Sequence, residues 1–198
     1  MERNYGVKRD LAAGGTRMEA DKGKHKIAAG DVALIGVMTA VIIVCKEVLS
    51  FLPNIELVSF WIIMFTLFFK WRVFFAVPVF VLIEGCLYGM NIWWIMYLYA
   101  WPLLAILTYV WRRQKSVWFW SVLSGAFGLS FGFLCALPYA VVGITDNGFR
   151  GGFYAGFTWW VAGLPFDIVH CIGNFVIMMI LYQPVRKMML KIHFLSDN

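Results

Sequence analysis

Six runs of apolar residues, separated by short polar links, account for most of this chain. A transmembrane helix needs about 20 residues to cross the hydrocarbon of a bilayer, with about 17 as a lower limit. Four of the runs meet that length easily, which makes water an improbable solvent for their surfaces. The six runs lie at about 30–52, 56–70, 73–90, 93–111, 117–144 and 153–183.

The second and third runs are short, and only Lys70, Trp71 and Arg72 divide them. A single span over 56–90 would be too long and would place Lys70 and Arg72 in lipid, where charges are costly. We therefore interpret them as two helices joined by a tight turn. The expected fold is an all-α membrane protein with six transmembrane helices.

The composition agrees with this fold class. Hydrophobic residues make up 62% of the 198 residues and charged residues 14%, whereas a soluble domain carries about a quarter charged residues. The length suits one domain. We expect a flexible cytoplasmic tail over 1–27, a six-helix transmembrane domain over 28–190 and a cytoplasmic C-terminal tail over 191–198.

The positions of the basic residues predict the orientation of the helices. Of the 17 Lys and Arg residues, Arg150 lies in a link of one side and Lys46 lies within the first helix. The others lie in the N-terminal tail, in the links at 70–72 and 112–115, and at the C-terminus. These connections alternate, so the positive-inside rule places both chain ends in the cytoplasm. The net charge of +6 therefore indicates topology and contact with anionic lipid, with no nucleic-acid partner.

Ionisable and polar residues within the spans are few, and most lie toward the predicted outer side. Asp167, His170 and Asn174 are spaced i, i+3, i+7 and share one helical face. They can contact a polar ligand or lock the helix to its neighbours. Glu84 lies near Tyr88 and suits a cationic or hydrogen-bond-donating ligand, or an ion pair with Lys46. The candidate substrate-binding residues are Glu84, Asn91, Trp94, Asp167, His170 and Asn174.

Two glycine- or alanine-rich segments also stand out. Ala29, Ala33, Gly36 and Ala40 form a stripe of small residues on the first helix, which allows close approach of another helix, from this chain or from a partner. The link 143–156 holds five glycines, and we expect it to be a mobile outer loop, either a gate or a plain connection.

Motifs for common enzyme chemistry are absent from the sequence. There is no GxxxxGK[ST] loop, no HExxH and no GxSxG. One His and one Asp in the sixth run are too few to hold a metal, and none of the four cysteines forms a CxxC pair. We expect no catalytic residues, no metal and no cofactor. An intramembrane enzyme that uses Asp167 and His170 as acid–base groups is the weaker reading.

This organisation resembles the substrate-binding S components of energy-coupling factor (ECF) transporters, the vitamin importers of bacteria and archaea. The resemblance covers residues 28–190. It is carried by the six-helix plan, by the small-residue stripe and by the local segments IGVMTAVIIVCKEVL, LPNIE and YQPVRK.

The resemblance implies a function and partners. An S component captures a vitamin-like molecule from outside, docks on a transmembrane coupling protein driven by two ATPase subunits, and tips to release its cargo. The chain would then be a multi-pass protein of a bacterial plasma membrane and not an enzyme. Ala29, Ala33, Gly36 and Ala40 match the family's coupling-protein contact, with one glycine in place of alanine. The alternative is a stand-alone small-solute carrier or channel subunit.

Overall fold

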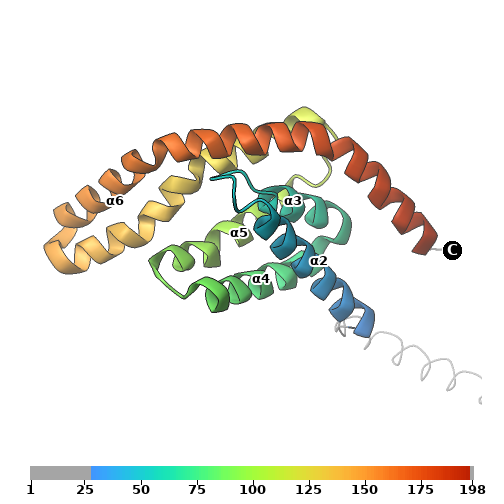
Figure 1. Cartoon of the computed structure of the whole chain (residues 1–198), viewed down its shortest axis with the longest axis horizontal. Helices are drawn as coiled ribbons and strands as arrows, with labels where there is room; N and C mark the ends of the chain where they lie inside the picture. The colour runs from blue at the N-terminus through green and yellow to red at the C-terminus, as the bar shows by residue number, and fades with distance from the viewer. Residues whose placement is uncertain (1–27, 197–198) are drawn as a thin grey trace, which may run out of the picture. The chain divides into compact units, whose positions relative to one another are not determined.

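The computed structural model describes residues 28–196, with side chains through Lys191, and every regular element in that range is helical (Figure 1). The predicted tail 1–27 lies outside the described residues. The chain divides into two units, 1–32 and 33–198, and the packing described below is that of the second unit. The elements are α2 (Ala29–Val48), α3 (Val58–Phe69), the 3₁₀ turn η1 (Lys70–Arg72), α4 (Val73–Tyr88), α5 (Ile92–Val110) and α6 (Val117–Ser196).

Four stretches of the described chain are helical, long and apolar enough to cross a membrane. They are Ala29–Val48, Val58–Tyr88, Ile92–Val110 and Val117–Lys191. Many large apolar side chains on them point outward: Val48 and Val110 are each 63% exposed, and Trp118 is 66% exposed. A soluble monomer rarely exposes apolar surface on this scale. The helices are thus compatible with a multi-pass membrane protein.

The backbone breaks where Lys70 and Arg72 interrupt the apolar sequence. Helix α3 ends at Phe69, and Lys70 takes a positive φ of 53° while its N–H donates to the carbonyl of Thr66. Helix α4 then begins at Val73. The left-handed backbone at Lys70 ends the α3 hydrogen-bond ladder, and it leaves both basic side chains at a helix end.

Helix α6 contains one interruption, at Asn147 and Gly148, where Gly148 has a φ of 67°. Figure 1 shows the chain turning back on itself there, so that two long arms of α6 run beside each other. The mobile loop predicted over 143–156 is therefore wrong, because that segment is helical apart from the two residues of the break.

The glycines of that segment have a packing role. A Cβ added at Gly152 would lie 2.6 Å from the carbonyl oxygen of Ala140, and one at Gly143 would lie 2.9 Å from the Cα of Gly152. Both distances are too short for real atoms. Glycine thus lets the two arms approach to backbone contact, as small residues do between membrane helices.

The core of the second unit surrounds α5. Trp101 and Leu104 of α5 are fully buried, as is Phe80 of α4. Helix α5 packs against α3, α4 and α6. Trp101 makes edge-on or tilted ring contacts with Phe80, Tyr97 and Phe131 at centroid distances of 5.3–6.2 Å. This aromatic cluster forms the base of the cavity described next.

Candidate functional site

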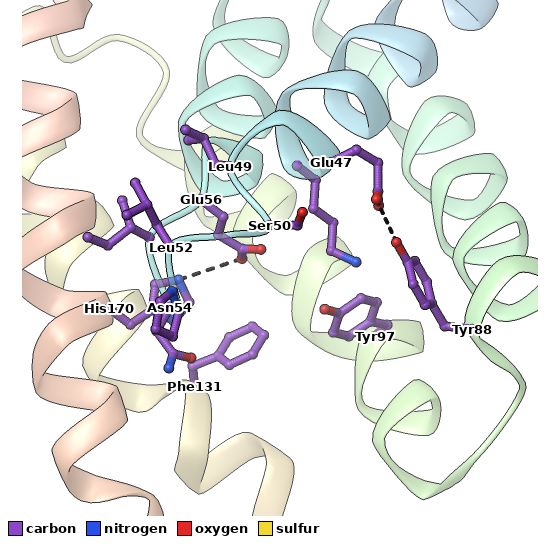
Figure 2. A pocket seen from close by; sticks show the side chains of 13 residues that line it. Glu47, Leu49, Ser50, Leu52, Asn54, Glu56, Tyr88, Tyr97, Phe131 and His170 are labelled. Carbon is purple, nitrogen blue, oxygen red and sulfur yellow. Dashed lines mark hydrogen bonds and ion pairs between the residues drawn. The ribbon is translucent and has the colours of Figure 1, made fainter.

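A cavity of about 320 Å³ opens where one end of α2, α4 and α5 meets the middle of the second α6 arm (Figure 2). That volume is at the small end of the range for small-molecule sites. The link between α2 and α3 supplies much of its wall. The lining residues are Lys46, Glu47, Leu49, Ser50, Leu52, Pro53, Asn54, Ile55, Glu56, Tyr88, Tyr97, Phe131 and His170.

The link 49–57 takes its shape from successive tight turns. The N–H of Leu52 donates to the carbonyl of Leu49 at 2.9 Å, and that of Ile55 donates to the carbonyl of Leu52 at 3.3 Å. Pro53 cannot continue a ladder, and Asn54 has a positive φ of 59°, which asparagine tolerates better than most residues. The link is thereby folded close to the helix ends and carries Glu56 to the cavity wall.

Lys46 lies at the centre of the polar groups. Its Nζ forms an ion pair with Oε2 of Glu84, whose side chain is fully buried. The same ammonium lies 5.0 Å from the ring centre of Tyr88 and 5.7 Å from that of Tyr97, which adds cation–π attraction. Oε1 of Glu84 has no hydrogen-bond partner among the described residues. The pair therefore leaves one acceptor unsatisfied beside the cavity.

A second contact joins α2 to α4 at the mouth of the cavity. The hydroxyl of Tyr88 donates to Oε2 of Glu47 at 2.6 Å. Figure 2 shows this pair on the opposite side of the cavity from His170 and Glu56. Tyr88 is 49% exposed, so this side of the cavity is open and a ligand can compete for the same groups.

On the other side, Oε1 of Glu56 lies 3.6 Å from Nε2 of His170. Burial raises the pKa of Glu56 from 4.5 to about 7, with Lys46 opposing the rise and Glu84 adding to it. The His170 ring is edge-on to Phe131 at 4.9 Å, and its Nε2 has no hydrogen-bond partner in the part of the chain that the structure describes. Glu56 and His170 thus form a polar edge that a ligand can complete.

The structure places the six predicted binding residues in two groups. His170 lines the cavity. Glu84 does not line it but forms an ion pair with Lys46, which does. The other four, Asn91, Trp94, Asp167 and Asn174, do not line it, and their contacts are internal.

Those internal contacts tie helices together. Nε1 of Trp94 donates to the carbonyl of Val81 at 2.7 Å, and Oδ1 of Asp167 accepts from the N–H of Gly132 at 2.9 Å. Nδ2 of Asn174 donates to Oγ of Ser59 at 3.2 Å. Asn91 is exposed and immediately precedes α5, and its carbonyl accepts from the N–H of Trp94 at 3.0 Å. Their role in binding stays a prediction.

Several lining residues were not among the candidates chosen from the sequence. Lys46, Glu47 and Glu56 line the cavity, and of these only Lys46 was considered above, as a possible ion-pair partner of Glu84. The signal that identifies them is their position. These three ionisable residues lie near the two ends of the link 49–57, which brings them close together when it folds back. Tyr88 and Tyr97 carry no such signal.

The ionisable groups of the cavity indicate the kind of ligand that suits it. Within residues 28–191, no group of three or more His, Cys, Asp or Glu is placed to hold a metal ion. Besides His170 and the tyrosines, the ionisable groups in and behind the cavity are one cation, Lys46, and three carboxyl groups, Glu47, Glu56 and Glu84. This excess of acid favours a ligand with positive charge or several hydrogen-bond donors.

The small residues of α2 are exposed. Ala33, Gly36 and Ala40 are exposed in the second unit, and Ala29 is exposed in the first. A Cβ added at Gly36 would meet nothing within 4 Å. The part of the stripe within 33–40 therefore does not serve close packing against α3–α6.

Comparison with protein-family models, with curated proteins and with solved structures finds no match to this chain.

Proposed function

We propose that this chain is the substrate-binding subunit of an ECF-type importer. It captures a vitamin-like small molecule from outside a bacterial cell and delivers it inward with a transmembrane coupling protein and two ATPase subunits. The observation that carries the proposal is the cavity of about 320 Å³, lined by Lys46, Glu47, Glu56 and His170. All of these residues lie on the side that the charge pattern assigns to the exterior.

The orientation supports an outward-facing site. In the proposed orientation, with six crossings and both ends in the cytoplasm, the link 49–57 and the turn at Asn147 lie outside. Six crossings require that Val58–Tyr88 divides at η1 and α6 at Gly148, and both helical stretches are interrupted at these positions. The cavity then opens on the side from which an imported solute arrives.

The lining defines the class of ligand. Phe131 and Tyr97 supply ring faces and edges, and Glu47, Glu56 and Tyr88 supply acceptors. A polar molecule with a heteroaromatic ring and a cationic or donor-rich portion satisfies both kinds of contact. Such a ligand also suits Nε2 of His170, which has no hydrogen-bond partner among the described residues.

Native mass spectrometry of the purified chain tests the proposal. We expect a co-purified molecule of vitamin size, bound at least about ten-fold more weakly by Glu56→Gln, since this change removes a carboxylate that accepts from the ligand. The matched control is Asp146→Asn, which removes an exposed carboxylate that does not line the cavity. A chain that binds no small molecule, or equal loss in the control, contradicts the proposal.

The coupling contact has its own test. Gly36→Leu fills the exposed stripe, and we expect it to abolish co-purification of the coupling protein while ligand binding persists. Val79→Leu adds bulk at another exposed position, on α4, and should leave the complex intact. Retention of the partner by Gly36→Leu contradicts the assignment of the stripe.

A further inference from the structure

A second polar cavity, of about 340 Å³, lies at the other end of the helices from the candidate site. Helix α6 contributes to both cavities, and α5 runs from one toward the other. Along α6, sixteen residues separate His170 from Arg186, which is about 24 Å at 1.5 Å per residue. On α5, Tyr97 lies near the first turn and Arg112 follows the last. The second cavity therefore lies on the side that the proposed orientation assigns to the cytoplasm.

This second cavity is strongly basic. Five cationic side chains line it, and none of the described residues that line it is acidic. They come from three separate segments: η1, the α5–α6 link and the last part of α6. The lining residues are Leu67, Phe68, Lys70, Arg72, Arg112, Gln114, Lys115, Tyr182, Arg186 and Leu190.

The walls of the cavity are held in place. The carbonyl of Lys70 accepts from the N–H of Val73, which closes η1. Nε1 of the fully buried Trp120 donates to the carbonyl of Gln114 at 3.2 Å and fixes the α5–α6 link. Tyr182 is 1% exposed. The basic groups are thus presented by ordered backbone around a defined space.

The positive-inside rule accounts for the side on which these residues lie but not for their convergence. Arg113 and Lys187 are on the same side, adjacent in sequence to Arg112 and Arg186, and they do not line the cavity. Like charges that approach closely repel each other, and a bound anion reduces that repulsion. A phosphate group fits because arginine and lysine are its usual partners.

The edge of the cavity indicates the source of the phosphate. Leu67, Phe68 and Leu190 contribute apolar surface beside the charges. Close by in sequence, Val110 and Trp111 at the end of α5 are 63% and 42% exposed. A ligand with a phosphate head and an apolar tail contacts both surfaces. Basic pockets between membrane helices on the cytoplasmic side suit anionic lipid head groups.

We propose that the cavity lined by Lys70, Arg72, Arg112, Lys115 and Arg186 binds the phosphate head group of an anionic phospholipid of the cytoplasmic leaflet. The proposal rests on the orientation of the proposed function but not on its substrate. This lipid site lies at the opposite end of the helices from the cavity lined by Glu56 and His170, hereafter the solute cavity.

Native mass spectrometry of the full chain with added lipid tests this. We expect dioleoyl-phosphatidylglycerol to bind about ten-fold more tightly than dioleoyl-phosphatidylcholine. Arg112→Gln and Arg186→Gln should each weaken phosphatidylglycerol binding by about five-fold. The matched controls Arg113→Gln and Lys187→Gln remove the same charge one residue away and should leave binding unchanged. Arg186→Lys keeps the charge and should retain binding even if Arg186→Gln fails to fold.

Other outcomes overturn the proposal. Equal binding of the two lipids, or equal loss in the controls, indicates a diffuse positive surface. Displacement of the lipid by inorganic phosphate at equal concentration assigns the cavity to a free anion. If Arg186→Gln keeps its lipid and instead loses a co-purifying protein chain, the cavity binds protein. The same spectra report the vitamin-sized ligand, so failure of the lipid site and failure of the proposed function are separate results.

Discussion

Glu56 is a largely buried carboxyl group whose protonation changes near neutral pH. Its neighbours are Lys46 of α2, Glu84 of α4, Tyr97 of α5 and His170 of α6. Burial raises the pKa of its carboxyl to about 7 from 4.5. Between pH 4.5 and about 7, the Glu56 carboxyl is therefore protonated in the folded protein and ionised in the unfolded chain.

The sign of the pH dependence follows from that difference. The contribution of Glu56 to stability is fully present below pH 4.5 and is lost as the pH rises through about 7. We expect the melting temperature in detergent to fall between pH 5 and pH 8, and Glu56→Gln to flatten this fall. At about 1.4 kcal/mol per pH unit, the effect is about 3 kcal/mol at most. Asp146→Asn should keep the wild-type slope, and an unchanged slope in Glu56→Gln contradicts the assignment.

The ion pair of Lys46 with Glu84 gives a second prediction for single residues. Glu84 is fully buried, so Lys46→Met leaves an uncompensated carboxylate in the core. Removal of one partner of a buried pair costs about 3 kcal/mol or more. We expect Lys46→Met and Glu84→Gln each to lower the melting temperature, and the double variant to lose much less than the sum. Additive losses in this double-mutant cycle would show that the two side chains do not interact.

Spacing along the chain predicted the shared face of Asp167, His170 and Asn174, and all three are buried. It did not predict which of them reaches a cavity. That depends on what the opposite helix presents: a backbone N–H at Gly132 and the hydroxyl of Ser59 engage Asp167 and Asn174. These partners lie 35 and 115 residues away in the same chain, so the local sequence does not reveal them.

At the level of elements, α6 depends on glycine for the contact between its two arms. A Cβ at Gly128 would lie 2.8 Å from the carbonyl oxygen of His170, whereas one at Gly163 would meet nothing within 4 Å. We expect Gly128→Ala to destabilise the protein by about 1–3 kcal/mol through backbone displacement. Gly163→Ala should be neutral or stabilise by up to about 1 kcal/mol through helix propensity.

Thermal unfolding followed by tryptophan fluorescence measures both glycine variants. The displacement in Gly128→Ala acts on His170, so weaker binding at the cavity should accompany the loss of stability. Equal melting temperatures for the two variants would contradict close packing of the arms.

The same glycines explain why one element was predicted wrongly. A high density of glycine is typical of loops, so it predicted a loop over 143–156. In the structure these glycines instead allow two helical arms to pack closely. The turn at 70–72 was predicted well because two charges within an apolar run have few alternatives. The cost of a charge in lipid is visible in the local sequence. A glycine in a loop and a glycine in a helix contact differ only in the segment that packs against them, which the local sequence does not show.

For the whole molecule, the decisive property is its orientation, because both cavities take their roles from it. The solute cavity is lined by Asn54, and the basic cavity by Lys115. In the proposed orientation these two positions lie on opposite sides of the membrane. The distribution of Lys and Arg, with 17 such residues and few near the solute cavity, is the physical basis for the assignment.

Cysteine labelling tests the orientation. The starting protein has Cys45, Cys86, Cys135 and Cys171 replaced by serine or alanine. In intact cells, a membrane-impermeant maleimide should label Asn54→Cys and Asp146→Cys, but label Lys70→Cys and Lys115→Cys only after permeabilisation. The reverse pattern would place the solute cavity in the cytoplasm and contradict capture from outside. Labelling of Asp146→Cys and Asn54→Cys from different sides would contradict the six-helix plan, because an even number of crossings must separate them.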